Sequence, residues 1–461
     1  MMTQTTNLIP EATPTLLGRT IGHLRRIWRT PSSNTIADEL QLSPELNPGD
    51  SEQLIQWMDG CLLQECNEVT ARNRAVILGR SYLRLNEQGR SRFLLLLAEH
   101  YGINNEQIEE CFQLWKNAPA EERAKAGQQL RESLDPPRLR LLTQFNGLPE
   151  GVKFLVDMRA ELLTLKKTYP QLAELEADLK RLLISWFDIG LLQLEQINWQ
   201  SSAERLEKLI AYEAVHEIQS WDDLKNRLDS DRRCFAFFHP NMPNEPLIFV
   251  EVALVKGLAN NVQTLLDEAA PLQDIQQADT AIFYSISNAQ PGLAGISFGN
   301  FLIKRVVARL QQEYPHLTQF STLSPMPGFC RWLEQQNESE LEQLSGGKQW
   351  LQLKSDSDIS DHMPPAEARE PLLSLACHYL SQVKGRGHLS KDPVAHFHLS
   401  NGAQIAQLNW LADSSAKGLQ QSAGIMVNYL YQLPQIESRS QDYSQQGSVS
   451  LAPSLKPLLK L

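Results

Sequence analysis

The chain has 461 residues, of which 42% are hydrophobic and 21% are charged, and its formal net charge at pH 7 is -11. This length favours two or more domains with ample core, and the composition is ordinary for a globular protein. The acidic balance argues against a nucleic-acid partner, because no cluster of lysines and arginines offsets it. The six cysteines lack CxxC spacing and no secretory signal precedes them, so we expect reduced thiols and a cytoplasmic location. The longest apolar run, residues 93–98, is too short to cross a membrane.

The first 190 residues are predicted to be helical. Near the N-terminus, TIGHLRRIWR is a short basic stretch, which we interpret as the first helix of the fold in preference to a targeting helix. From about residue 50, apolar residues recur at three- and four-residue spacing in segments such as 92–102 and 151–167, and Asn105 sits where a helix cap is expected. Few candidate catalytic groups cluster there. We therefore predict a helical packing or oligomerisation domain over residues 1–190.

Strand-like sequence begins after residue 190. Residues 234–240 and 246–255 are rich in aromatic and β-branched side chains, which is typical of strands. A further buried strand is predicted at 281–287, followed by a loop that carries Gly292, Gly295 and Gly299. A helical stripe then runs from Phe301 until Pro315 ends it.

The glycine loop between this strand and helix is a candidate anion site, because backbone N–H groups and the helix dipole both face it. The P-loop lysine and serine are missing and the dinucleotide-binding spacing fits poorly, so an ordinary packing turn is the alternative. Arg232, Arg233, Lys304 and Arg305 lie in the same half of the chain. They could meet an acidic ligand, although most charges on a helix face are only solvated.

Candidate chemical groups follow the loop. A strand over 320–325 would place Ser324 and Thr322 on one face, with Pro325 ending the ladder. If VAHFHLS is also a strand, His396 and His398 share a face; a metal pair or a satisfied structural histidine are the alternatives. Asn401 and Gly402 would form the turn after it.

The remaining C-terminal segments carry weaker signals. Tyr429 and Tyr431 would share one face of a later strand, where core packing is the alternative to a functional role. Residues 355–370 are acidic and poor in apolar side chains, which predicts a surface loop or disordered insertion. The tail from Ser438 is Ser- and Gln-rich and then Pro-spaced, and we expect it to be extended. It ends in Leu-Lys-Leu, which is not the peroxisomal Ser-Lys-Leu signal.

Four runs in the second half occur together and in order. They are Tyr-Ser-Ile-Ser at 284–287, Gly-Leu-Ala-Gly at 292–295, Phe-Leu-Ile-Lys-Arg-Val-Val at 301–307 and Leu-Ser-Pro-Met-Pro-Gly-Phe at 323–329. Together they closely resemble malonyl-CoA decarboxylase, and further matching positions extend the resemblance over about residues 80–435. The resemblance implies an α+β protein with a helical N-terminal domain (1–190) and a catalytic domain (191–461) related in fold to acetyl-CoA-dependent N-acetyltransferases.

The resemblance also implies an enzyme of fatty acid metabolism that converts malonyl-CoA to acetyl-CoA and carbon dioxide as a homotetramer or dimer. Neither a metal nor a cofactor is expected, because the CoA thioester is the substrate. The implied catalytic residues are Ser324, His398 and Tyr431. The implied substrate-binding residues are Ala294, Gly295, Ile296, Ser297, Phe298, Gly299 and Asn300, together with Ser324 and His398. Ser297 stands where close relatives carry a glutamate, which leaves the role of that carboxylate open.

Decarboxylation would leave a thioester enolate, whose charge the glycine loop would stabilise by about 3–4 kcal/mol per backbone donor. We expect His398, with a pKa near neutral pH, to protonate the carbanion, a role worth roughly 10²–10⁴ in rate. Ser324 would bind the malonyl carboxylate or relay a proton, and no nucleophile elbow suggests an acyl-serine. Tyr431 would donate to the histidine or the carboxylate. The rival hypotheses are a CoA-dependent acyltransferase and a catalytically inactive CoA-binding scaffold.

Overall fold

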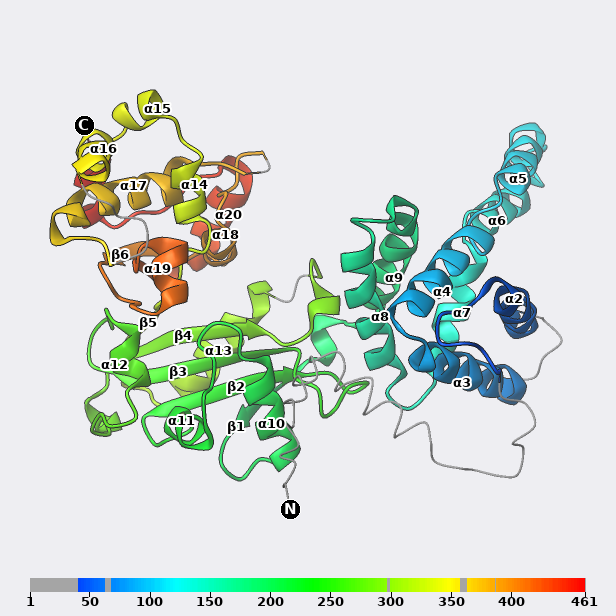
Figure 1. Ribbon diagram of the computed structural model, residues 1–461, viewed down its shortest axis with the longest axis horizontal. Helices are drawn as coiled ribbons and strands as arrows, with labels where there is room; N and C mark the ends of the chain where they lie inside the picture. The colour runs from blue at the N-terminus through cyan, green and yellow to red at the C-terminus, as the bar shows by residue number, and fades with distance from the viewer. Residues whose placement is uncertain (1–39, 63–67, 297–298, 357–362, 386, 461) are drawn as a thin grey trace, which may run out of the picture. The chain divides into compact units, whose positions relative to one another are not determined.

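The computed structural model describes residues 40–62, 68–296, 299–356, 363–385 and 387–460 (Figure 1). The chain divides into two compact units. Unit 1 takes the residues up to Leu191 together with His239–Pro243 and Gln290–Ile296, and unit 2 takes the rest of the chain. The basic stretch TIGHLRRIWR lies outside the described residues.

Unit 1 is built from helices, as the three- and four-residue apolar spacing predicted. Phe154, in its interior, is 1% exposed and contacts the Tyr82 ring edge-on at a centroid distance of 5.6 Å. Asn104, one residue before the predicted cap, accepts hydrogen bonds from the next helix's first turn. The helices of unit 1 are α2 (Pro48–Leu62), α3 (Glu68–Arg84), α4 (Glu87–His100), α5 (Asn105–Asn117), α6 (Arg123–Ser133), α7 (Pro137–Asn146), α8 (Gly151–Leu165) and α9 (Ala173–Trp186), with short 3-10 turns η2 (Pro170–Leu172), η3 (Ile189–Leu191) and η5 (Pro291–Leu293).

Unit 2 is organised around a mixed seven-stranded sheet of order β1-β2-β3-β4-β5-β7-β6. The central strands are apolar along nearly their whole length, and seven of the eight residues of β3 are buried, because both faces of the sheet are covered. All neighbouring pairs in this sheet are antiparallel except β4 and β5, which run parallel. The strands are β1 (Gln193–Ile197), β2 (Arg232–Phe238), β3 (Ile248–Val255), β4 (Thr280–Asn288), β5 (Gln319–Thr322), β6 (Gln404–Asn409) and β7 (Met426–Leu430).

Helices cover this sheet, and in Figure 1 α14 to α20 gather around its β6 end while α10 and α11 lie beside β1 and β2. The α-helices of unit 2 are α10 (Ala203–Tyr212), α11 (Trp221–Arg227), α12 (Val262–Leu266), α13 (Gly299–Glu313), α14 (Phe329–Glu334), α15 (Glu338–Glu342), α16 (Gly347–Asp356), α17 (Arg369–Gln382), α18 (Pro393–Ser400), α19 (Ala416–Ser422) and α20 (Ile436–Gln446). Its 3-10 turns are η4 (Ile275–Gln277), η6 (Ala366–Ala368), η7 (Leu433–Gln435) and η8 (Pro453–Leu459). The predicted α+β class, helical first and sheet-based second, is confirmed.

Two local predictions are wrong, and a third is wrong in part. The segment VAHFHLS is helix α18, because Asp392 caps its first turn and Pro393 occupies a position where a missing N–H costs nothing. The tail is not extended, because Tyr443 is 1% exposed and anchors helix α20 in the core. Part of the acidic segment 355–370 is also helical, in α16, η6 and the start of α17, while residues 357–362 lie outside the described part.

Within the described ranges, no helix is both long enough and apolar enough to cross a membrane.

Candidate active site

Three separate elements of unit 2 bring Ser324, His398 and Tyr431 together. Ser324 lies just beyond β5 and pairs with Val427 of β7 through two backbone hydrogen bonds of 2.9 and 2.8 Å. Tyr431 follows β7, and its backbone N–H donates to Phe320 of β5. His398 lies on α18. The three side chains are 6%, 2% and 3% exposed for Ser324, His398 and Tyr431, so they form a site shielded from water.

A chain of hydrogen bonds joins the three predicted catalytic side chains. Tyr431 Oη lies 2.7 Å from His398 Nδ1, and His398 Nε2 lies 3.1 Å from Ser324 Oγ. The Ser324 hydroxyl donates to Thr322 Oγ1 at 2.9 Å. Because the single Ser324 hydrogen is used there, its oxygen must accept from Nε2–H, and Nδ1 must accept from the Tyr431 hydroxyl. Every donor therefore points the same way, from Tyr431 through His398 to Ser324.

The protonation states of this chain follow from burial. Loss of hydration lowers the pKa of His398 from 6.5 to about 3, so the imidazole is neutral at physiological pH. Burial raises the pKa of Tyr431 well above its ordinary value, which keeps the phenol protonated. The prediction that the pKa of His398 lies near neutral pH is therefore wrong, because no carboxylate among its hydrogen-bond partners stabilises the imidazolium.

Two neighbours that we assigned no catalytic role hold the chain in place. The Tyr429 ring stacks on His398 with a centroid distance of 4.5 Å and an interplanar angle of 26°. Thr322, besides accepting from Ser324, accepts from the backbone N–H of Tyr429 at 3.2 Å. The shared face of Ser324 and Thr322, and that of Tyr429 and Tyr431, were visible in the sequence. The roles themselves were not, since they depend on which elements meet.

His396 and His398 do not act as a pair. On the helix they reach different partners: His396 Nδ1 lies 3.0 Å from the Tyr443 hydroxyl, whereas His398 meets Ser324 and Tyr431. In the part of the chain that the structure describes, no group of three or more His, Cys, Asp or Glu side chains is arranged to hold a metal ion. Asn401 ends α18 and Gly402 follows with a φ of +80°, as the predicted turn requires.

The glycine loop is fixed by a buried arginine within unit 1. Arg159 of α8, 1% exposed, donates to the carbonyl oxygens of Gly292 and, at 2.8 Å, of Ala294. Gly292 packs so tightly that an added Cβ would lie 1.8 Å from the Val156 carbonyl oxygen, and Gly295 has a φ of +72°. We interpreted 151–167 only as a packing helix, and an arginine within its apolar stripe was the available signal for this role.

The other predicted substrate-binding residues divide between the units and the undescribed gap. Ala294, Gly295 and Ile296 belong to unit 1, whereas Ser324 and His398 belong to unit 2. Ser297 and Phe298 lie outside the described residues, and Gly299 and Asn300 begin α13. The role of this loop in binding stays a prediction.

The arginines proposed to meet an acidic ligand have protein partners. Arg232 pairs with Asp231 at 2.8 Å, and Arg233 with Glu313 at 3.4 Å. Arg305 donates to the Leu192 carbonyl oxygen at 2.7 Å. These contacts favour a structural role for all three, while Lys304 is exposed on α13.

Comparison with known proteins identifies the family. A family model described as the malonyl-CoA decarboxylase C-terminal domain matches residues 190–461, and one described as the malonyl-CoA decarboxylase N-terminal domain matches residues 101–187. The chain belongs to the malonyl-CoA decarboxylase family. The mitochondrial malonyl-CoA decarboxylase of Rattus norvegicus is 38% identical to it over an alignment of 386 residues, and the match covers 77% of this chain and 78% of the relative.

Solved structures of malonyl-CoA decarboxylases also resemble this protein along most of its length. The crystal structure from Rhodopseudomonas palustris has a TM-score of 0.81 and 38% identity, covering 88% of this chain and 99% of that one. The structure from Agrobacterium vitis has a TM-score of 0.79 and 36% identity, covering 89% and 100%. The predicted resemblance is therefore confirmed for both the helical and the sheet-containing parts.

Proposed function

We propose that this chain decarboxylates malonyl-CoA to acetyl-CoA and carbon dioxide, with Ser324, His398 and Tyr431 as its catalytic residues. Family membership supplies the substrate, and the buried, uncharged hydrogen-bond chain through these three side chains is the observation that supports the site. A neutral imidazole whose Nε2–H is oriented by its partners is suited to donate a proton. It is poorly suited to act as an imidazolium acid, because burial lowers its pKa.

For each malonyl-CoA, the proposed reaction consumes one proton from water and releases one carbon dioxide. The C–C bond to the carboxylate breaks, carbon dioxide leaves, and the electron pair forms a thioester enolate. The α-carbon then takes the proton from Nε2 of His398, whose tautomer the Tyr431 hydroxyl fixes by donating to Nδ1. A proton from water then restores Nε2–H. Ser324, which now accepts from Nε2–H, positions the acyl group at that nitrogen.

We also propose that the loop at 294–300 binds the CoA thioester, as the family resemblance implies. The Arg159 contacts to Gly292 and Ala294 support this role, since they fix the start of the loop before any ligand arrives and so lower the entropic cost of binding. Gly295→Ala should raise KM for malonyl-CoA, because the residue must adopt a φ of +72°. Gly257→Ala is the matched control: Gly257 also has a φ of +72°, with nothing near an added Cβ, and it lies outside the loop. An unchanged KM in Gly295→Ala would contradict the binding role.

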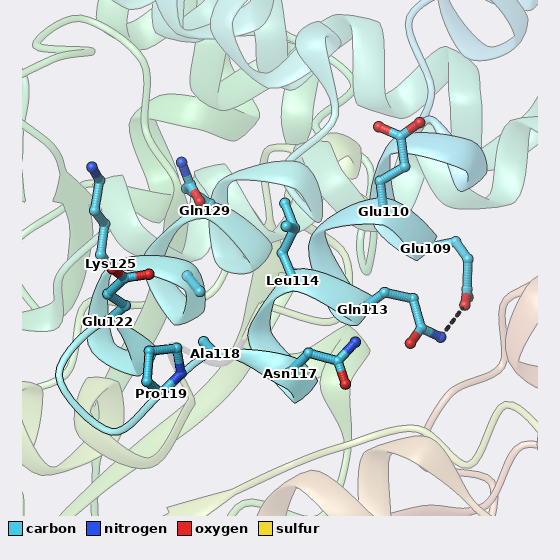
Figure 2. Close-up of a pocket in the computed structure, with 11 residues that line it drawn as sticks. Glu109, Glu110, Gln113, Leu114, Asn117, Ala118, Pro119, Glu122, Lys125 and Gln129 are labelled. Carbon is cyan, nitrogen blue, oxygen red and sulfur yellow. Dashed lines mark hydrogen bonds between the residues drawn. The ribbon is translucent and has the colours of Figure 1, made fainter.

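We propose that the helical hairpin of α5 and α6 supports the homo-oligomer that the resemblance implies. Helix α5 has no buried residue, and Leu114 and Trp115 are 60% and 38% exposed. Figure 2 shows the groove between the two helices, with Leu114 at its centre and charged side chains at its margins. Leu114→Glu should lower the oligomeric mass measured by sedimentation. A retained mass would assign the contact to another surface.

The cytoplasmic location also stays a prediction. The curated relatives from rat and mouse are both named mitochondrial, and the first 39 residues of this chain lie outside the described part. Fractionation of cells that express the full chain would decide between the compartments.

One experiment separates the proposed activity from its rivals. Purified protein is incubated with malonyl-CoA and no amine acceptor, and both acetyl-CoA and carbon dioxide are measured. A decarboxylase releases both in equal amounts, and His398→Ala lowers the rate of release by about 10²–10⁴. An acyltransferase turns over only after an amine is added. A CoA-binding scaffold binds malonyl-CoA without turnover under either condition, which would overturn the proposal.

A further inference from the structure

We propose that Asp392 is a positioning residue that couples the Ser324 loop to the His398 helix and so sets the distance between the two catalytic side chains. The inference rests on the proposed function. Asp392 is itself 0% exposed and lies outside the Tyr431–His398–Ser324 chain. A buried carboxylate that the chemistry does not use needs a physical reason to be there, because an unpaired charge in the core is costly.

One oxygen of Asp392 holds the helix that carries His398. Its Oδ1 accepts hydrogen bonds from the backbone N–H groups of Val394 and Ala395, both at 3.0 Å. These are free donors of the first turn of α18, and the helix dipole also favours a negative charge there. His398 follows six residues later on the same short helix. Any tilt of the helix at Asp392 therefore moves the imidazole.

The second oxygen of Asp392 faces the segment that follows Ser324. Oδ2 accepts from the Tyr379 hydroxyl at 3.2 Å, and the backbone N–H of Gly328 faces the same carboxylate. Gly328 lies four residues after Ser324. An added Cβ on Gly328 would sit 2.3 Å from Tyr379 Oη and 3.6 Å from Asp392 Oδ2, so this backbone rests directly against the pair.

The four donors around Asp392 explain why the residue is an acid. Burial raises its pKa, and the donors Ala395, Tyr379, Gly328 and Val394 offset only part of that rise. An asparagine could still cap the helix through its oxygen. Its amide nitrogen could still donate to the Tyr379 hydroxyl, which can rotate to accept, but it would face the Gly328 N–H, which can only donate, and would push the Ser324 segment away. Asp392→Asn therefore separates helix capping from coupling.

The test compares Asp392→Asn with a cap lost elsewhere. In the full-length enzyme, Asp392→Asn should lower kcat on the order of 10²-fold with KM for malonyl-CoA changed less than about threefold, because a displacement of about 1 Å costs that much rate. The control is Asn337→Ala, which removes the cap that accepts from Glu340 N–H at 2.8 Å on α15. It should lower the melting temperature by roughly 2–4 °C and leave kcat unchanged.

A double-mutant cycle distinguishes positioning from general damage. If Asp392 acts through the Ser324–His398 distance, adding Asp392→Asn to Ser324→Ala should change the residual kcat by less than about twofold. If Asp392→Asn lowers kcat in the Ser324→Ala variant as much as in the wild type, the inference is overturned. Wild-type kcat in Asp392→Asn alone would overturn it as well. Loss of activity in Ser324→Ala and His398→Ala beside a wild-type Asp392→Asn would refute only this inference. An inactive wild-type protein would refute the proposed function itself.

Discussion

Each unit contains one buried polar network, and the two differ in charge. Around Arg159 in unit 1 the groups are charged: Arg159 pairs with Glu176 at 2.8 Å, and Lys166 reaches the other oxygen of Glu176 at 2.6 Å. Around His398 in unit 2 the groups are neutral, and each hydroxyl or imidazole donates to the next. The first arrangement fixes backbone carbonyls in space, and the second leaves a proton free to move.

The electrostatics of each network agree with this division. Burial acts to raise the pKa of Glu176, but the hydrogen bonds and charges of Lys166 and Arg159 outweigh it and leave that pKa lowered. His398 has no such compensation, so burial lowers its pKa to about 3. The paired charges of Arg159 and Glu176 can stay ionised in the interior and support the backbone. His398 has no charged hydrogen-bond partner among the described residues, so an imidazolium there would destabilise the fold.

The largest expected effect comes from removing the centre of the neutral network. His398→Ala should lower kcat/KM by about 10²–10⁴, because the proposed proton donor is lost while the charged network around Arg159 is unchanged. Steady-state assays with malonyl-CoA measure the effect, and binding of malonyl-CoA by calorimetry should persist. If the variant kept more than a tenth of the wild-type kcat/KM, His398 would not be the proton donor.

Breaking the charged network should cost stability in its turn. Arg159→Met leaves the mostly buried Glu176 with Lys166 alone and should lower the free energy of unfolding by about 3–5 kcal/mol. Arg181→Met is the matched control, because its pair with Asp135 is 60% and 65% exposed and should be worth less than about 1 kcal/mol. Urea unfolding gives both values. Equal losses of unfolding free energy in the two variants would show that the buried ion pair of Arg159 contributes no more to stability than an exposed pair.

The pH dependence should report the neutral network. The folded state disfavours protonation of His398, so its contribution is complete above the unfolded pKa of 6.5 and is lost as the pH falls toward about 3. At pH 5 the loss should be about 2 kcal/mol. His398→Gln should remove its own share of this slope from urea unfolding curves, whereas the exposed His100→Gln should leave the slope unchanged. Loss of hydration also lowers the pKa of His216 to about 4, and this residue supplies a further share of the slope in both variants. The kcat/KM profile should also lack an inflection near pH 6.5, and finding one would mean that the catalytic imidazole titrates normally.

The smallest effect is expected at the far end of the neutral chain. Tyr431→Phe removes the hydroxyl that donates to His398 Nδ1, which frees the other tautomer and should lower kcat by roughly 10-fold, or about 1–2 kcal/mol. Tyr443→Phe is a close control, because Tyr443 makes the equivalent contact to His396 at 3.0 Å. It should leave kcat unchanged. Equal effects from the two tyrosines would mean that the chain through Tyr431 has no special role.

Local sequence was enough to place most elements of this fold. The strand, glycine loop, helix and strand between residues 280 and 322 follow from apolar periodicity punctuated by glycine and proline, which acts over a few residues. The same local logic misassigned VAHFHLS as a strand. The Asp-Pro pair at 392–393 was the signal for a helix start. The strand prediction instead followed the alternation of histidines and apolar residues in this segment.

Sequence by itself therefore determined the class, the order of elements and the family, and it singled out Ser324, His398 and Tyr431 as candidates. Only the tertiary structure decided that these three meet, since Ser324 and His398 are 74 residues apart and His398 and Tyr431 are 33 apart. It also decided that His398 is neutral, that Arg159 holds the carbonyl oxygens of Gly292 and Ala294, and that Asp392 caps α18. Burial and hydrogen-bond partners belong to the packed chain, because each depends on elements that no local pattern connects.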